Sequence, residues 1–83
     1  MDMIARSPQQ LGTGIKRYRR KKDLTQGELG EKMNARQATV SKLEAGEPAT
    51  QLRILMDALA ALDLELVIRP RTKMSAEAIE DLF

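Results

Sequence analysis

The chain has 83 residues, of which 42% are hydrophobic, with one Tyr, one Phe and no Trp. This length fits one small domain, and a core built from aliphatic residues and Met is thin enough to favour a homodimer. Because the chain has no Cys and no His, disulfides, thiolate nucleophiles, ordinary zinc sites and imidazole chemistry are excluded, and we expect neither a cofactor nor an enzyme. No stretch resembles a signal peptide or a membrane span, so we expect a cytoplasmic protein without membrane association.

The net charge of +2 is unevenly distributed along the chain. Residues 1–22 hold seven basic residues and one acidic residue, a balance of +6, and most of the basic residues lie in the run at 16–22. Alone, such a run is an ordinary solvated helix face. Beside a DNA-binding motif, it favours attraction to a polyanion.

The first predicted helix runs from about residue 8 to about residue 22. Ser7 can cap it, Pro8 suits its first position, and Gln10 would complete a capping box with Ser7. Asp23 is typical of the turn that follows. The buried face is predicted to consist of Leu11, Ile15 and Tyr18, which recur at helical spacing.

A second capping box, formed by Thr25 and Glu28, begins the next predicted helix. Gly30 lies inside this helix, where glycine costs about 1 kcal/mol relative to alanine. Its presence therefore indicates that another helix packs close at that point. The inward positions of this helix are Leu29 and Met33.

The turn after the second helix is predicted at Asn34-Ala35, because Asn tolerates the left-handed conformation. A third helix then runs from about residue 36 to about residue 44, and Gly46 ends it. Its inward positions are Val40 and Leu43.

Two short helices joined by a tight turn are typical of a helix-turn-helix, whose second helix enters the DNA major groove. The candidate base contacts are Arg36, Gln37, Ala38, Ser41 and Lys42. Arg36 can fork onto guanine, Gln37 can pair with adenine, and Ala38 can meet a thymine methyl group. Phosphate contacts are expected from Gln26, at the N-terminus of the preceding helix, and from Thr39. The alternative is the polar face of an ordinary surface helix, which leaves the turn and the basic run unexplained.

The fourth predicted helix covers about residues 50 to 63 and carries two neighbouring apolar stripes. The first consists of Leu52, Leu55, Met56, Leu59 and Leu62. The second, Ile54, Ala58 and Ala61, is the candidate dimer face, since this helix has more apolar surface than its own core needs.

Residues 64–69 alternate in polarity and predict a short strand that Pro70 stops. No other strand is predicted, so its partner is expected to be the same strand of a second copy. The predicted dimer interface therefore contains Ile54, Ala58, Ala61, Leu64, Leu66, Val67 and Ile68.

The segment from Leu11 to Gly46 resembles the Xre/phage-repressor class of helix-turn-helix proteins. The matching motifs are Ile15-Lys16-x-x-Arg19, Leu24-Thr25-Gln26, Glu28-Leu29 and Val40-Ser41-Lys42-x-Glu44-x-Gly46. The resemblance implies a four-helix, lambda-repressor-like domain with a buried structural ion pair between Arg19 and Glu44. The departures from the family pattern are Asn34 for the usual turn glycine, Gly30 for the usual alanine, and Asp23 where glycine is common.

Residues 50–83 narrow the resemblance to HipB-like antitoxins. That resemblance implies a homodimer with an intersubunit strand pair, operator DNA upstream of its own operon, and a HipA-like serine/threonine kinase toxin as partner. We therefore expect an all-α DNA-binding and dimerisation domain at 1–70, with a short strand pairing across the homodimer, and a flexible tail at 71–83. The apolar end of the tail is expected to bind the toxin, unless it is disordered or folds back on its own dimer; it consists of Ile79, Leu82 and Phe83.

The expected function is sequence-specific repression from a palindromic operator, with half-sites about 34 Å apart. Such a protein is nucleoid-associated when bound, and as the antitoxin of a kinase it also regulates its own operon. Two alternatives stay open: a stand-alone Xre-type repressor without a toxin partner, and an adaptor that uses the same fold to bind protein only.

Overall fold

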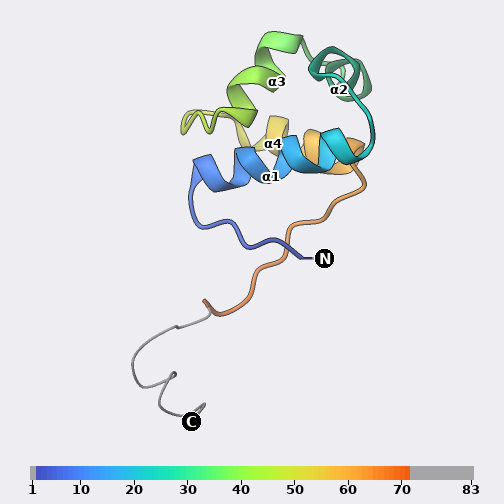
Figure 1. Ribbon diagram of the computed structural model, residues 1–83. Coiled ribbons are helices and arrows are strands. Elements are labelled where there is room, and N and C mark those ends of the chain that lie inside the picture. The colour runs from blue at the N-terminus through green and yellow to red at the C-terminus, as the bar shows by residue number, and fades with distance from the viewer. Residues whose placement is uncertain (1, 72–83) are drawn as a thin grey trace.

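The computed structural model describes residues 2–71, which form four helices. They are α1 (Pro8–Lys21), α2 (Gln26–Met33), α3 (Gln37–Glu44) and α4 (Leu52–Ala61). In Figure 1, α2 and α3 lie together above α1 and α4, while the residues before α1 and those directly after α4 extend on the opposite side. The predicted all-α architecture is confirmed.

Side-chain caps begin two of these helices. The Ser7 hydroxyl accepts a hydrogen bond from the Gln10 backbone N–H at 3.1 Å, and the Thr25 hydroxyl accepts one from Glu28 at 3.0 Å. Glu28 completes the second capping box by accepting from the Thr25 backbone N–H at 2.9 Å. The capping box predicted for the first helix is wrong in its second bond, because the Gln10 side chain accepts from the Arg6 N–H at 2.6 Å. Each cap contributes about 1 kcal/mol.

All four helices end in the same backbone motif. A residue in the left-handed conformation follows each last turn, namely Asp23 (φ 55°), Asn34 (φ 58°), Gly46 (φ 82°) and Asp63 (φ 59°). The next N–H then bonds back across the turn, in the pairs Leu24 to Arg19 (3.2 Å), Ala35 to Gly30 (2.7 Å), Glu47 to Lys42 (3.1 Å) and Leu64 to Leu59 (2.8 Å). These are Schellman motifs, which satisfy the last carbonyls of a helix and reverse the chain within a few residues.

The core lies where the four helices meet. Its buried members are Ile15, Leu29, Met33, Val40, Leu43, Ala58 and Leu62. The predicted inward positions of α2 and α3 are all among them, while Leu11 and Tyr18 of α1 are half-buried against the cluster. Burying one such side chain contributes about 1.5–3 kcal/mol. Since every helix supplies members, the same cluster holds α2 and α3 at a fixed angle to each other.

Two glycines allow close backbone approaches. A Cβ on Gly12 of α1 would lie 2.5 Å from the Glu44 carbonyl oxygen, so α1 and the end of α3 are in near-backbone contact. A Cβ on Gly30 would lie 2.7 Å from the Ala35 carbonyl oxygen. The prediction that another helix packs against Gly30 is therefore wrong: the close neighbour is the α2–α3 turn itself.

The two stripes of α4 have roles that the sequence pattern did not separate. Ala58 is fully buried in the core of its own chain, and Ile54 and Ala61 pack against that core. The prediction that this stripe is the dimer face is therefore wrong for Ala58. The exposed residues belong to the other stripe, where Leu52 is 67% and Met56 is 45% exposed.

The strand predicted at residues 64–69 is not formed within the described chain. The C-terminal segment, residues 64–71, has no regular secondary structure and leaves Leu66, Val67 and Ile68 exposed. A strand exists only when its backbone pairs with another strand, and residues 2–71 offer no second one. The predicted tail contacts at Ile79, Leu82 and Phe83 lie outside the described residues.

Candidate nucleic-acid interface

The α3 helix has a buried face and an exposed polar face. Val40, Leu43 and Glu44 are buried, with Val40 at 0% exposure. The five predicted base contacts are all exposed, namely Arg36, Gln37, Ala38, Ser41 and Lys42. The helical period places one set inward and the other outward, because residues three and four apart share a face. The structure thus gathers the predicted base contacts on one accessible surface.

The N-terminus of α3 has backbone N–H groups and a local charge that suit an anionic ligand. Arg36 is the N-cap residue, with an extended backbone at φ −79° and ψ 154°, so it precedes the helix instead of belonging to it. No side chain caps this terminus, and its first turn contains no acidic residue. Its first N–H groups therefore carry the positive end of the helix dipole without a nearby carboxylate to oppose it.

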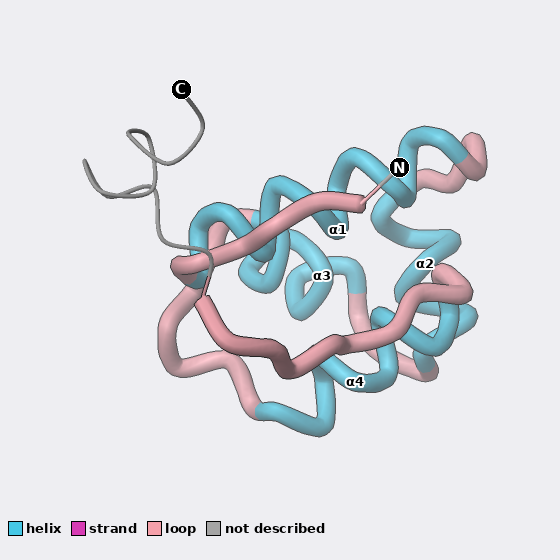
Figure 2. Tube along the Cα trace, turned by 90° about the horizontal axis from the view of Figure 1, so that it is seen from below, coloured by secondary structure: helices cyan, strands magenta, loops and turns pink. Residues whose placement is uncertain are grey.

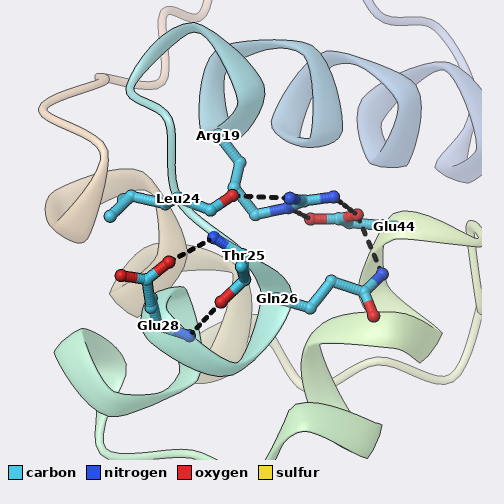
Figure 3. Close-up of polar contacts among 6 residues, drawn as sticks. All are labelled: Arg19, Leu24, Thr25, Gln26, Glu28 and Glu44. Carbon is cyan, nitrogen blue, oxygen red and sulfur yellow. Dashed lines mark hydrogen bonds and ion pairs between the residues drawn. The ribbon is translucent and has the colours of Figure 1, made fainter.

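A buried ion pair joins α1 to α3 (Figure 3). Arg19 Nε lies 2.6 Å from Glu44 Oε2, and Arg19 Nη2 lies 3.0 Å from Glu44 Oε1. The two side chains are only 8% and 3% exposed. Arg19 Nη1 also donates to the Leu24 carbonyl at 2.7 Å, in the turn that leads into α2. The ion pair that the family resemblance implies is thus present, and it connects three segments.

Gln26 is the polar extension of this network. It occupies the first position of α2, and its Nε2 donates to Glu44 Oε1 at 3.1 Å. The side chain is half-buried, between the fully buried pair and the surface. The sequence pattern predicted a phosphate contact for Gln26 but did not reveal this hydrogen bond, because the two residues lie 18 positions apart. No local spacing rule connects them.

Hydrogen-bond partners stabilise the charged forms of Arg19, in the network, and of Glu28, in the capping box of α2. The hydrogen bonds that Arg19 donates to Glu44 raise the pKa of Arg19 above its usual value, against the opposing effect of burial. Hydrogen bonds from the backbone and hydroxyl of Thr25 lower the pKa of Glu28. Among the described residues, no buried side-chain polar atom lacks a hydrogen-bond partner. Removing one member of a satisfied buried pair typically costs about 3–5 kcal/mol.

The remaining predicted phosphate contact has a different setting. Thr39 is half-buried and lines a groove of about 300 Å³ between α3 and the beginning of α4. Lys42 lies on the same groove, together with Thr50 and Ile54. Thr39 therefore lies at the edge of the exposed face of α3, beside the loop that follows the helix.

The basic run of α1 forms a positively charged surface. Its members are Lys16, which is half-buried, and the exposed Arg17, Arg20, Lys21 and Lys22. None of these five forms an ion pair with a residue in 2–71, and Lys21 lies 5.0 Å from the centre of the Tyr18 ring. Their charge is thus available to attract a polyanion from solution.

An apolar surface lies on the side opposite α2 and α3. Figure 2 shows the N-terminal arm, residues 2–7, and the C-terminal segment both crossing this side. They border an open groove of about 1070 Å³, whose apolar lining includes Ile4, Leu52, Leu55, Leu66, Val67 and Ile68. Of the predicted dimer residues, Leu66, Val67 and Ile68 lie here and are exposed, whereas Leu64 is half-buried against the core. Ile68, at 94% exposure, has almost no contact with the rest of residues 2–71.

Two other kinds of site have no support in the described residues. No described helix has the length and apolar character needed to cross a membrane. Within residues 2–71, no three acidic residues are grouped so as to hold a metal ion.

Two short helices, α2 and α3, are joined by a tight turn, and α3 exposes a polar face while a buried ion pair fixes it to α1. These features define the class of this protein as a helix-turn-helix domain. The family model described as Helix-turn-helix (HTH_3) matches residues 15–68. Two curated relatives are the Antitoxin HipB of Escherichia coli O6:H1 (strain CFT073) and that of Escherichia coli K12. The first is 34% identical, covering 89% of this chain and 79% of the relative, and the second is 32% identical, covering 89% and 84%.

Solved structures agree with these sequence relatives. A chain of a HipA-HipB-O2-O3 complex matches with a TM-score of 0.79 and 30% identity, covering 86% of this chain and 100% of that chain. A chain of a HipB-O4 20mer complex matches with a TM-score of 0.80, 30% identity and the same coverage. The chain belongs to the Xre-type helix-turn-helix family and, within it, to the HipB type.

Proposed function

We propose that this protein is a DNA-binding antitoxin that represses its own operon and binds a HipA-like serine/threonine kinase toxin. The observation that carries the proposal is the exposed polar face of α3, held by a buried network in a HipB-type chain. Similar chains occur in a HipA-HipB-O2-O3 complex and in a HipB-O4 20mer complex. The protein acts by occupying its operator and by capturing a partner, as a regulator and not as an enzyme.

Sequence specificity is assigned to the exposed face of α3. Arg36 and Gln37 stand at its beginning, where the helix of a helix-turn-helix meets base edges. Arg36 pairs with guanine, Gln37 with adenine, and Ala38 packs on a thymine methyl group. Further base contacts are assigned to Ser41 and Lys42, which are exposed on the same face.

Affinity is assigned mainly to phosphate contacts and charge. Gln26 lies at the beginning of α2, and Thr39 lines the groove between α3 and α4. The basic surface of α1 adds a sequence-independent attraction. Neutralising phosphates releases counterions from DNA, so binding is expected to weaken steeply as salt concentration rises.

The functional unit is assigned as a homodimer. The C-terminal segment exposes Leu66, Val67 and Ile68, and pairing with its copy would satisfy its backbone and cover these side chains. Leu52 of α4 lines the groove that this segment borders, and the exposed Met56 lies one helical turn further along α4. Two α3 helices related by a two-fold axis then read a palindromic operator with half-sites about 34 Å apart.

Toxin binding is assigned to this protein because its relatives are HipB antitoxins and a similar chain occurs in a HipA-HipB-O2-O3 complex. In the sequence, the tail ends in the apolar residues Ile79, Leu82 and Phe83, which are proposed to contact the kinase. When bound to its operator, the antitoxin would be associated with the nucleoid.

The test of DNA binding uses fluorescence anisotropy with the DNA upstream of the gene and a scrambled duplex, each at two salt concentrations. The wild-type protein is expected to prefer the upstream DNA at both. Gln37→Ala should lose about 1–3 kcal/mol of that preference, since one bidentate base contact is removed. Gln9→Ala, the same change at an exposed position of α1, is the matched control and should bind like the wild type. A protein without any sequence preference would contradict the proposal.

The test of toxin binding is co-purification with a kinase encoded beside this gene. Deleting residues 79–83 should weaken the complex and leave operator binding unchanged. If the protein binds DNA specifically but no kinase co-purifies with it, the protein is a stand-alone repressor. If the kinase binds but DNA does not, the protein is an adaptor.

A further inference from the structure

The Arg19–Glu44 pair is placed to do more than stabilise the fold. The Glu44 carboxylate accepts three hydrogen bonds: two from Arg19, and one from Gln26 Nε2 at 3.1 Å. Figure 3 shows the carboxylate between the guanidinium and the Gln26 amide. The buried pair therefore touches a side chain that, in the proposed function, contacts the DNA backbone.

The chemistry of the two groups determines how the amide is oriented. A carboxylate only accepts hydrogen bonds, so the atom of Gln26 that faces Glu44 must be the nitrogen. The Gln26 carbonyl oxygen then points away from Glu44, and the amide cannot flip without losing this bond. One N–H is bound to the carboxylate, and the second N–H is left to donate to another acceptor. A phosphate oxygen, which also only accepts, is the acceptor that suits it.

Charge balance makes this arrangement compatible with DNA. A bare carboxylate close to a phosphate would repel it, but the bidentate contact with Arg19 neutralises Glu44. Gln26 is uncharged and half-buried, so its amide can bridge the neutralised pair and an anion at the surface by donating one hydrogen bond to each.

We propose that Glu44 is a positioning residue for DNA binding, because it holds the Gln26 amide with its second N–H presented to a backbone phosphate. This inference rests on the proposed function. It adds a mechanism by which the buried ion pair and the DNA interface are coupled: the carboxylate that joins α1 to α3 also pre-orders a contact on α2. Without that bond, the long Gln26 side chain would lose rotamer freedom on binding and would present its oxygen to the phosphate in part of its conformations.

The experiment is a double-mutant cycle on operator affinity. Glu44→Asp keeps the charge that Arg19 needs but withdraws the carboxylate from Gln26. We expect it to weaken operator binding about five- to tenfold in the wild-type background and less than twofold in the Gln26→Ala background, as coupled residues behave. The folded fraction of each variant is measured by circular dichroism in the binding buffer. Ser7→Ala removes a cap at the far end of α1 and serves as the destabilised control, which should show no coupling to Gln26.

A second measurement does not depend on a variant at Glu44. Hydrogen exchange of the two Gln26 side-chain N–H protons is followed by nuclear magnetic resonance, with and without operator DNA. We expect one proton to be protected in the free protein and the second to become protected on DNA. Equal losses for Glu44→Asp in both backgrounds, or no protection of the second proton, would overturn the inference while leaving the proposed function intact. Absence of operator binding by the wild type would instead remove the proposed function.

Discussion

Asp23 is the residue at which a single substitution should make this protein more stable. It ends α1 in the left-handed conformation, at φ 55°, and it leads into Leu24, whose carbonyl accepts from Arg19. A residue with a Cβ is strained there, whereas glycine is not. Asp23→Gly should therefore relieve strain without moving the turn that supports the ion pair.

The magnitude follows from two opposing contributions. The left-handed conformation costs about 1–2 kcal/mol for an ordinary residue, and Asp is among the more tolerant. Glycine offsets part of this gain, because the unfolded chain with glycine loses more conformational entropy on folding, a cost of about 0.4–1 kcal/mol. The expected net gain is about 0.5–1 kcal/mol, which corresponds to roughly 2–8 °C in Tm for a domain of this size. Charge contributes little, because attraction of Asp23 to the basic last turn of α1 opposes its repulsion by the helix dipole.

Thermal unfolding by circular dichroism measures this change, at one fixed protein concentration because the Tm of the proposed dimer would depend on concentration. Asp23→Asn removes the charge but keeps the Cβ, and should change Tm by less than the glycine variant. Glu31→Gly, an exposed position inside α2, is the matched control and should lose about 1 kcal/mol. If Asp23→Gly lowers Tm as Glu31→Gly does, the backbone argument is incorrect.

Three further changes test other parts of the structure. Gly12→Ala should lower the free energy of unfolding by about 1–3 kcal/mol in urea, because its Cβ would meet the Glu44 carbonyl oxygen at 2.5 Å; an unchanged midpoint would show that α1 can shift without cost. Because the pKa of Glu28 is lower in the folded protein, its ionised side chain stabilises the fold at pH values above its ordinary pKa. This contribution is lost as the pH falls through the pKa of the folded state. Glu28→Gln should therefore flatten the acid limb of a stability–pH profile, and an identical limb would contradict this. Ile68→Asp should leave the fold intact and shift sedimentation from dimer to monomer, whereas a variant that stays dimeric would count against pairing of the C-terminal segment.

Local signals explain why so much of the helix-turn-helix could be predicted. The Thr25–Glu28 capping box, the left-handed Asn34 and the terminal Gly46 each act within a few residues, and all three are present. The alternation of buried and exposed positions along α3 likewise follows from the helical period alone. The left-handed conformation of Asp63 was missed, because the predicted fourth helix ran to residue 63 and Asp adopts this region less readily than glycine does.

Errors arose where two arrangements satisfy the same pattern. Both stripes of α4 have helical spacing, and only the structure shows that each contributes to the core, Ala58 from one and Leu62 from the other, while Leu52 and Met56 stay exposed. Gly30 indicated a close neighbour correctly, but the neighbour is the turn at Ala35. The Gln10 side chain reaches Arg6 instead of Ser7. In each case the short-range pattern indicates that a residue makes a close contact, but it does not determine which residue is the partner.

The amino-acid sequence by itself determined the helices, their ends, the polar face of α3 and the family to which the chain belongs, because each depends on neighbours a few residues apart. Only the tertiary structure decided how Arg19, Glu44 and Gln26 meet, where Gly12 lets α1 approach α3, and which apolar side chains stay exposed. Those features depend on helices brought together by a shared core, and burial in that core rewards shape and volume that no spacing rule records.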